Sequence, residues 1–205
     1  MKRTFLIVAV ACFAASAAAS NENTASEACI SGKSKDRVHL TAESRIEMCS
    51  DWMQQDKSAR SLALLYRAEV YAEQKQWKDA FQDYSQMLEL DAGNPSGWYN
   101  RGALRARHFG QVEEAIADFN EAVALTHDRP RARYFLHRAA AYGRLIEEGD
   151  RTNAQKIEAL RVMESDLDTF MTLTVDKPWE EKKRAAAKDA LTYVAARMKA
   201  LKEDA

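Results

Sequence analysis

The sequence predicts an all-α protein built from stacked helical hairpins, and three observations support this prediction. The 205 residues include only 7 Gly and 3 Pro, too few for the many tight turns of a β-sandwich or barrel. Residues that favour helices, above all Ala, Glu, Lys, Arg and Leu, are in excess. When the chain is aligned with itself at an offset of about 34 residues, an apolar pattern recurs. A chain of this length suits one domain.

The first residues have the features of a secretory signal peptide. Lys2 and Arg3 precede an apolar stretch from Phe5 to Ala15, and small residues follow it. We therefore expect a signal peptide over residues 1–19 and a secreted mature protein. The apolar run is shorter than the ~20 residues that cross a bilayer, so no membrane span is predicted. Lipid attachment at Cys12 is the alternative, and the apolar run that continues beyond this residue argues against it.

Two further cysteines, Cys29 and Cys49, remain after removal of the signal peptide. In an oxidising compartment such a pair is expected to form a structural disulfide. A redox or metal pair is not favoured, because no Cys-x-x-Cys spacing is present and His39 alone cannot complete a tetrahedral set of ligands.

The segment around these cysteines is predicted to cap the repeats that follow. A helix begins after Thr41, which has the side chain of a good N-cap, and its apolar face includes the second cysteine. The disulfide would join it to a shorter helix or turn near residues 28–31. We expect a flexible leader over residues 20–27 and a disulfide-tied helical cap over residues 28–60.

The repeat itself is a pair of helices with small residues at recurring positions. The first pair is predicted over Ser61 to Glu73 and Trp77 to Leu90, and the second over Ser96 to His108 and Val112 to Leu125. Arg67-Ala68 recurs as Arg101-Gly102 and as Arg138-Ala139, and the small residue of each pair is expected at a close helix crossing. One such hairpin buries only one side, so its neighbours must complete the core. The positions that recur are Arg67, Ala68, Tyr71, Ala80, Asp83, Tyr84, Arg101, Gly102, Ala115, Asp118, Phe119, Arg138, Ala139 and Tyr142.

This pattern resembles the tetratricopeptide repeat (TPR) family, most clearly at Trp98, Tyr99, Gly102, Ala115 and Phe119. The chain is also similar to exported TPR proteins of Gram-negative bacteria, which implies a periplasmic setting. The resemblance implies a right-handed superhelical array of antiparallel helix pairs, an α-solenoid with capping helices at both ends. The repeats would be TPR 1 over residues 61–94, TPR 2 over 95–129, a degenerate hairpin over 130–175 and a C-terminal capping helix over 176–205.

Two local features depart from simple repetition. Residues 103–109 contain one residue more than the family pattern, and Arg105 replaces the usual aromatic residue. The last helix has an apolar seam at four- and three-residue spacing, which suits either a cap on the open end of the repeats or a coiled-coil dimer. The seam consists of Ala187, Leu191, Val194, Met198 and Leu201.

Composition and motifs point away from several classes of function. The chain has 30 basic and 31 acidic residues, whereas a nucleic-acid binder needs a surplus of basic ones. No nucleophile elbow, phosphate-binding glycine loop or metalloprotease motif is present. The four histidines are scattered without ligand spacing. We therefore expect a protein that is not an enzyme, with no cofactor and no metal site.

The arginines form an unusual set. No Lys occurs between Lys78 and Lys156, and arginine binds carboxylates through two parallel hydrogen bonds where lysine is a point charge. The sequence separations predict that Arg67 and Arg101 each bridge the two helices of one hairpin, to Asp83 and Asp118. The nine arginines of the interval are Arg101, Arg105, Arg107, Arg129, Arg131, Arg133, Arg138, Arg144 and Arg151.

The family resemblance also implies a groove lined by the first helices of successive repeats. We expect this groove to bind a protein segment, its arginines meeting carboxylates and its apolar residues adding contacts. The alternatives are a solvated charged face, and a structural protein that self-associates through the C-terminal helix. The main hypothesis is an adaptor or assembly factor for cell-envelope or exported proteins. The expected groove residues are Tyr99, Asn100, Arg107, Arg133, Leu136, His137 and Arg144.

Overall fold

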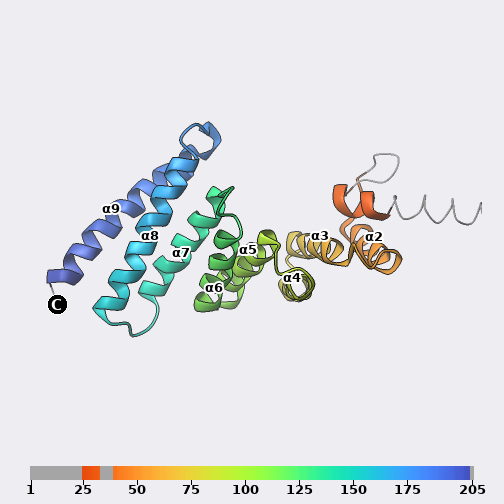
Figure 1. The fold of residues 1–205 in the computed structure, drawn as a ribbon, viewed down its shortest axis with the longest axis horizontal. Coiled ribbons are helices and arrows are strands. Elements are labelled where there is room, and N and C mark those ends of the chain that lie inside the picture. The colour runs from red at the N-terminus through yellow and green to blue at the C-terminus, as the bar shows by residue number, and fades with distance from the viewer. Residues whose placement is uncertain (1–24, 33–38, 204–205) are drawn as a thin grey trace, which may run out of the picture. The chain divides into compact units, whose positions relative to one another are not determined.

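A computed structural model describes residues 25–32 and 39–203, and helices make up most of this part of the chain (Figure 1). The all-α arrangement of helix pairs predicted from the sequence is confirmed. The structure divides into two compact units, Met1–Ala92 and Gly93–Ala205, which are described separately. The expected signal peptide over residues 1–19 and Cys12 lie outside the described residues.

The first unit contains a short helix over residues 25–31 and three longer helices. The Thr41 hydroxyl accepts a hydrogen bond from the Ser44 backbone amide at 3.2 Å and is the N-cap that the sequence predicts. The longer helices are α2 (Ala42–Gln55), α3 (Arg60–Glu73) and α4 (Trp77–Leu90). Successive helices pack against one another, α2 on α3 and α3 on α4.

A disulfide joins the short helix to α2, between Cys29 and Cys49, as the sequence predicts. Both cysteines are fully buried and pack with Trp52 and with Ala63 of α3. The expected flexible leader over residues 20–27 is wrong at its end, since residues 25–27 are helical. Ala25 is buried in the same cluster. Alanine alone gives too weak an apolar pattern to reveal this from the sequence.

The second unit continues the alternation of helices. Its elements are α5 (Pro95–Leu104), a π-helix η1 (Arg105–Phe109), α6 (Val112–Ala124), α7 (Ala132–Glu147), α8 (Asn153–Leu173), a 3₁₀ turn η2 (Pro178–Glu180) and α9 (Glu181–Glu203). The helices α7, α8 and α9 lie side by side in Figure 1, and α8 contacts both of the others. Local signals set the boundaries: Pro95 opens α5, and Thr152 and Gln155 form a capping box at α8.

The extra residue expected within residues 103–109 is absorbed by the π-helix. In η1 the Gly110 amide donates to the Arg105 carbonyl, five residues earlier, where an α-helix would use a residue four earlier. Gly110 has a φ of 66° and ends the helix in the left-handed region that glycine tolerates. A π-turn therefore accommodates the insertion without disturbing the pairing of α5 with α6.

Each hairpin is fastened by an arginine on its first helix and an aspartate on its second. The pairs are Arg67–Asp83, Arg101–Asp118 and Arg138–Asp166, each with two N–O hydrogen bonds of 2.7–3.0 Å. We call these pairs the Arg–Asp clamps. The sequence predicted the first two, and the third aspartate lies 28 residues after its arginine. Residues 130–175 therefore keep the hairpin arrangement that their sequence had largely obscured.

The small residue beside each clamp permits close helix packing, as Gly102 shows. A Cβ atom on Gly102 would lie 3.0 Å from the Asp118 Cβ and 3.1 Å from the Ala115 carbonyl oxygen. Neither neighbour is the end of a flexible side chain, so a larger residue here would push the α5–α6 crossing apart by a few tenths of an ångström. Ala68 and Ala139, at the matching positions, are buried.

The apolar seam of the C-terminal helix is used within the chain. Ala187, Val194 and Leu201 are buried in a core cluster with residues of α8, such as Leu160 and Leu167. This packing favours the cap over the coiled-coil dimer, because a dimer through the same seam would have to expose this core. Among the described residues, no helix combines the length and the apolar character needed to cross a membrane.

Candidate functional site

A pocket of about 310 Å³ opens between the two first helices of the second unit, α5 with η1 on one side and α7 on the other. The buried residues Phe119 and Ala141 lie at its floor, while Arg107, Ala140 and Arg144 are exposed around its opening. We call this space the α5–α7 pocket. Its lining is Ala103, Ala106, Arg107, Phe119, Leu136, His137, Ala140, Ala141 and Arg144.

Alanines create this space. Ala103 and Ala106 face it from α5 and η1, and Ala140 and Ala141 from α7. Larger side chains at these four positions would meet and fill the gap between the helices. The floor and walls are therefore apolar, and the polar groups stand only at the rim. A volume near 300 Å³ is at the lower end of ligand-binding pockets, which suits a single large side chain.

The structure brings together four of the seven expected groove residues, Arg107, Leu136, His137 and Arg144, as lining of the pocket. Tyr99 lies beside the pocket, with its hydroxyl in hydrogen-bond contact with His137, and Arg133 covers the Tyr99 ring. Asn100 is partly buried and does not belong to the lining. Among the lining residues, Ala103 and Ala140 belong to the inner wall that the family resemblance implies, whereas Phe119 was predicted only as a packing residue, and Ala106 and Ala141 were not predicted as site residues.

A hydrogen-bonded network joins Tyr99, His137 and Arg107 at one edge of the pocket. The Tyr99 hydroxyl lies 3.1 Å from the His137 Nδ1, and the Arg107 Nη2 lies 3.2 Å from the His137 Nε2. The same Arg107 nitrogen lies 3.3 Å from Nδ1, and the Tyr99 oxygen lies 3.5 Å from Nε2, so these distances do not select one tautomer. A guanidinium only donates, so the ring nitrogen that accepts from Arg107 must be unprotonated. In this form a neutral imidazole holds Arg107 in place.

The surroundings keep both ring systems of the network uncharged. Burial lowers the pKa of His137 to about 4, and the positive charges of Arg107, Arg133 and Lys183 act in the same direction. Burial also raises the pKa of Tyr99, although the charges of Arg133 and Arg107 oppose that shift. At neutral pH the formal charges of this edge are therefore the guanidinium groups alone.

Acid is expected to destabilise the second unit through His137. The unfolded imidazole titrates near pH 6.5 and the folded one near 4, so stability is constant above pH 6.5 and falls as the pH drops from 6.5 toward 4. At pH 5 the loss from this group is about 2 kcal/mol. Urea denaturation at pH 7 and pH 5 measures it. In His137→Gln, which keeps every other titrating group, the loss between the two pH values should be about 2 kcal/mol smaller. An equal loss in the variant and the wild type would contradict the lowered pKa of His137.

The two rim arginines of the pocket differ in their partners. Arg144 donates to the Ala106 carbonyl in η1 and binds Glu148 at 2.8 Å. It therefore acts as a cap on the π-helix, with its charge already paired. Arg107 makes no ion pair with any carboxylate in the described part of the chain, and its only hydrogen-bond partner named in the network is the imidazole.

The nine arginines between Lys78 and Lys156 divide in the same way. Arg101, Arg105, Arg138, Arg144 and Arg151 pair with carboxylates of the chain. Arg107, Arg129, Arg131 and Arg133 form no such pair within residues 25–32 and 39–203. Arg133 instead covers the Tyr99 ring, with its guanidinium carbon 4.7 Å from the ring centre. The arginines without carboxylate partners thus include two beside the pocket.

Solved structures of known function share this fold. The type III secretion chaperone SycD of Yersinia enterocolitica, in complex with a peptide of the translocator YopD, is 18% identical, with a TM-score of 0.53 over 65% of this chain and 91% of that chain. PcrH in complex with the chaperone-binding region of PopD is 20% identical, with a TM-score of 0.53 over 72% and 94%. A double mutant of MamA is 16% identical, with a TM-score of 0.52 over 89% and 95%.

The sequence comparisons give a shorter match. No protein-family model matches the chain. The human mitochondrial import receptor subunit TOM70 is 36% identical over 66 residues, which are 32% of this chain and 11% of that receptor subunit. The match therefore covers a small part of that protein. Together with the solved structures, it identifies the helical hairpins described above as a TPR fold.

Proposed function

We propose that this chain, with its TPR fold, is an adaptor or assembly factor that binds a segment of another protein in the α5–α7 pocket. The observation that carries this proposal is the pocket itself, which combines an apolar floor with a guanidinium at its rim, that of Arg107, for which the described residues supply no carboxylate partner. A segment with a large apolar side chain next to a carboxylate has the complementary chemistry. The apolar side chain would displace water from the floor, and the carboxylate would pair with Arg107.

The solved structures support a binding role. SycD, which shares the fold, was solved with a peptide of the translocator YopD, and PcrH with the chaperone-binding region of PopD. In our proposal the second unit of this chain uses the same general property of TPR folds, that side chains of successive first helices face a common space. The identity of the bound segment follows from the chemistry of this pocket and not from those complexes.

The proposed setting is the bacterial periplasm, where the partner would be a cell-envelope or exported protein. The basic and apolar N-terminal residues support export. A disulfide between Cys29 and Cys49 also suits an oxidising compartment. Cell fractionation with an antibody against the native protein tests the location, and recovery with cytoplasmic markers would contradict it.

Arg107→Ala is expected to weaken partner capture about tenfold while leaving the helices intact, because Arg107 is exposed and its charge has no carboxylate partner in the described chain. The measurement uses chemical crosslinking in cells of the source organism, with no substitution in the pocket lining. Mass spectrometry identifies the captured proteins. Each captured protein is then titrated, after purification, against the wild type and Arg107→Ala.

A matched variant keeps this test specific. Arg161→Ala removes an exposed arginine from α8, whose only ion pair is with Glu158 on the same helix, and capture should persist. Arg144→Ala is unsuitable as the probe, because it would also uncap the π-helix. Equal affinity of the wild type and Arg107→Ala for every captured protein would refute the pocket as the binding site.

A further inference from the structure

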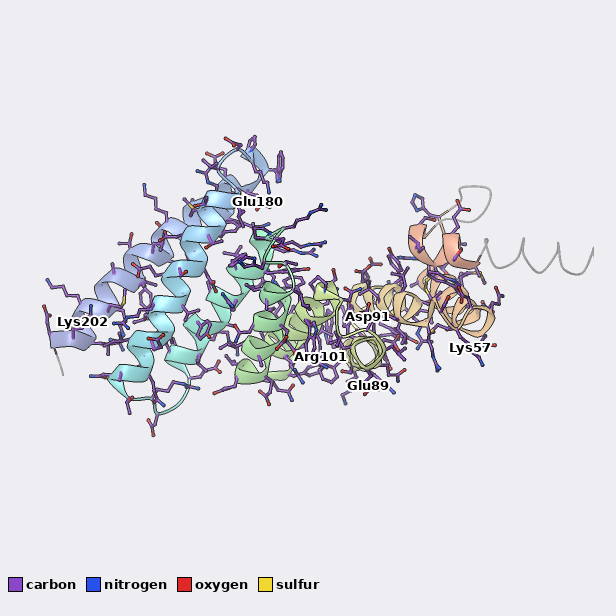
Figure 2. The ribbon with its side chains drawn as sticks, viewed as in Figure 1. Lys57, Glu89, Asp91, Arg101, Glu180 and Lys202 are labelled. Carbon is purple, nitrogen blue, oxygen red and sulfur yellow. A yellow bond between two sulfur atoms is a disulfide. The ribbon has the colours of Figure 1, made fainter. Side chains whose placement is uncertain are left out.

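The turn between α8 and α9 displays the most exposed large apolar side chains of the described chain. Trp179 is 76% exposed and Val175 is 58% exposed. Both belong to the connection that includes η2, and Figure 2 labels Glu180 of η2 at one end of the α8–α9 pair. A tryptophan this exposed is uncommon on a soluble protein surface and is the residue type most enriched at binding hot spots.

Hydrogen bonds hold this turn in one shape. The Arg184 Nη1 donates to the Val175 carbonyl at 3.0 Å, and the Lys177 amide donates to the Thr174 carbonyl at 3.0 Å. The Glu180 amide then donates to the Lys177 carbonyl, also at 3.0 Å, and closes the 3₁₀ turn. Thr174 is buried beneath. Because the turn is already ordered, binding through Trp179 would cost little conformational entropy.

The chemistry of this turn matches that of the α5–α7 pocket. Trp179 is a large aromatic side chain. The exposed carboxylates of Asp176 and Glu181 flank it in the sequence, with Lys177 and Lys182 next to them, and Lys183 pairs with Glu180 at 2.8 Å. The pocket offers an apolar floor of suitable size and the guanidinium of Arg107, which has no carboxylate partner in the described residues. Indole is also the aromatic ring that attracts a guanidinium most strongly.

We propose that the Trp179 turn of one copy of this protein inserts into the α5–α7 pocket of a second copy. The occupant must come from another copy, because Trp179 is largely exposed in the chain itself and its turn is fixed to α8 and α9. We call the Trp179 side chain the knob. A knob that fits a pocket on a different surface of the same kind of molecule produces a head-to-tail contact between copies. Such contacts continue into a ring or a filament unless two copies exchange knobs reciprocally.

This mode of self-association differs from the coiled-coil dimer considered from the sequence, because the apolar seam of α9 stays buried against α8. It rests on the pocket of the proposed function and gives that pocket a second role. A copy whose pocket holds the Trp179 turn of a neighbour cannot bind a partner there. Self-association would therefore compete with partner binding, and a partner segment of higher affinity would release the monomer.

Sedimentation velocity over a wide concentration range tests the proposal with the purified mature protein. The wild type should shift to larger species as concentration rises. Trp179→Ala, which removes the knob, and Ala140→Leu, which obstructs the pocket, should each weaken self-association by about tenfold or more. Leu125→Ala, which truncates another exposed apolar residue of the same unit, should behave as the wild type does.

Mixing the two defective variants gives the decisive result. Trp179→Ala keeps an open pocket and Ala140→Leu keeps the knob, so an equimolar mixture should form a one-to-one complex although neither variant associates alone. Circular dichroism confirms that both variants remain folded. Trp179→Ala should still bind a partner identified through the pocket, so a failure of self-association is distinguishable from a failure of the proposed function.

Three results would overturn the proposal. The wild type could remain monomeric at every concentration. Ala140→Leu could associate as strongly as the wild type while Trp179→Ala does not, which would place the knob on a different surface. Finally, phosphatidylglycerol vesicles could bind the monomer and shift the emission of Trp179 to the blue, with no such shift on self-association, which would assign the turn to a membrane surface.

Discussion

Replacing Asp118 with Ala is expected to lower the free energy of unfolding of the second unit by about 3–5 kcal/mol. The Asp118 side chain is buried and accepts three charged hydrogen bonds, two from Arg101 at 3.0 and 2.7 Å and one from Arg105 at 2.7 Å. Its removal leaves two partly buried guanidinium groups beside one another without the carboxylate that neutralises them. Urea denaturation followed by circular dichroism, with hydrogen exchange on the amides of α5 and α6, measures the loss.

The same substitution in the first unit provides a matched comparison. Asp83 is also buried, but it binds a single arginine, Arg67. That arginine has a further partner in the Ser50 hydroxyl at 2.9 Å. Asp83→Ala should therefore destabilise its own unit by less than Asp118→Ala destabilises the second. An equal or larger loss from Asp83→Ala would contradict the explanation based on the number of guanidinium groups that lose their aspartate.

A second variant separates charge from packing. Replacing all three members of the Asp118 cluster with apolar residues of similar size, Arg101→Met, Arg105→Met and Asp118→Leu, should recover most of the lost stability. The clamps would then contribute to the defined pairing of the helices more than to net stability. If the triple variant were as unstable as Asp118→Ala, the cluster itself would be required for stability.

Periodic features of this fold could be predicted from the sequence because they depend on local patterns. The predicted helix from Trp77 to Leu90 coincides with α4, and the predicted helix from Val112 to Leu125 differs from α6 by one residue. The separations of 16 and 17 residues also placed the first two clamps correctly. The sequence also showed that residues 103–109 contain one residue more than the repeat pattern, but it did not show that a π-helix accommodates this residue.

Features that depend on contacts across an insertion could not be predicted. Asp166 is the aspartate of the third clamp and follows a polar insert over residues 147–153. Its separation from Arg138 therefore matches neither earlier repeat. The role of Arg144 was similarly hidden. The sequence pattern placed it in the groove, but the carbonyl of Ala106, freed at the end of η1, and the nearby Glu148 both bind its guanidinium. Which arginines stay unpaired is decided by three-dimensional distances of this kind.

The floor of the pocket could not be predicted, for a related reason. The family resemblance places Ala103 and Ala140 on the inner wall, but in a sequence Ala106 and Ala141 look the same as Ala115 and Ala139, which sit at tight helix crossings. Alanine at a crossing lets two helices touch, whereas alanine where helices diverge leaves a space. Only the helix positions distinguish the two cases, so the apolar floor became apparent with the structure.

Removing the disulfide with Cys29→Ala and Cys49→Ala is expected to lower the free energy of unfolding of the first unit by about 3 kcal/mol, on the chain-entropy estimate for a loop closed over a separation of 20 residues. Both side chains are fully buried beside Trp52 and Ala63. Without the covalent link, the helix of residues 25–31 would be held by noncovalent contacts such as this small cluster. Urea denaturation of the mature protein, compared with the wild type, measures the loss.

The loss should be local, and this distinguishes the cap from the repeats. Hydrogen exchange should accelerate over residues 25–32 and at the start of α2, while the amides of α7 and α8, in the second unit, keep their protection. The wild type under reducing conditions is the matched control, because it loses the same bond without any substitution, and it should exchange as the double variant does. Uniform acceleration throughout the chain would contradict a cap that stabilises one end of the repeats. Unchanged exchange in the double variant would show that the buried cluster holds the short helix by packing alone.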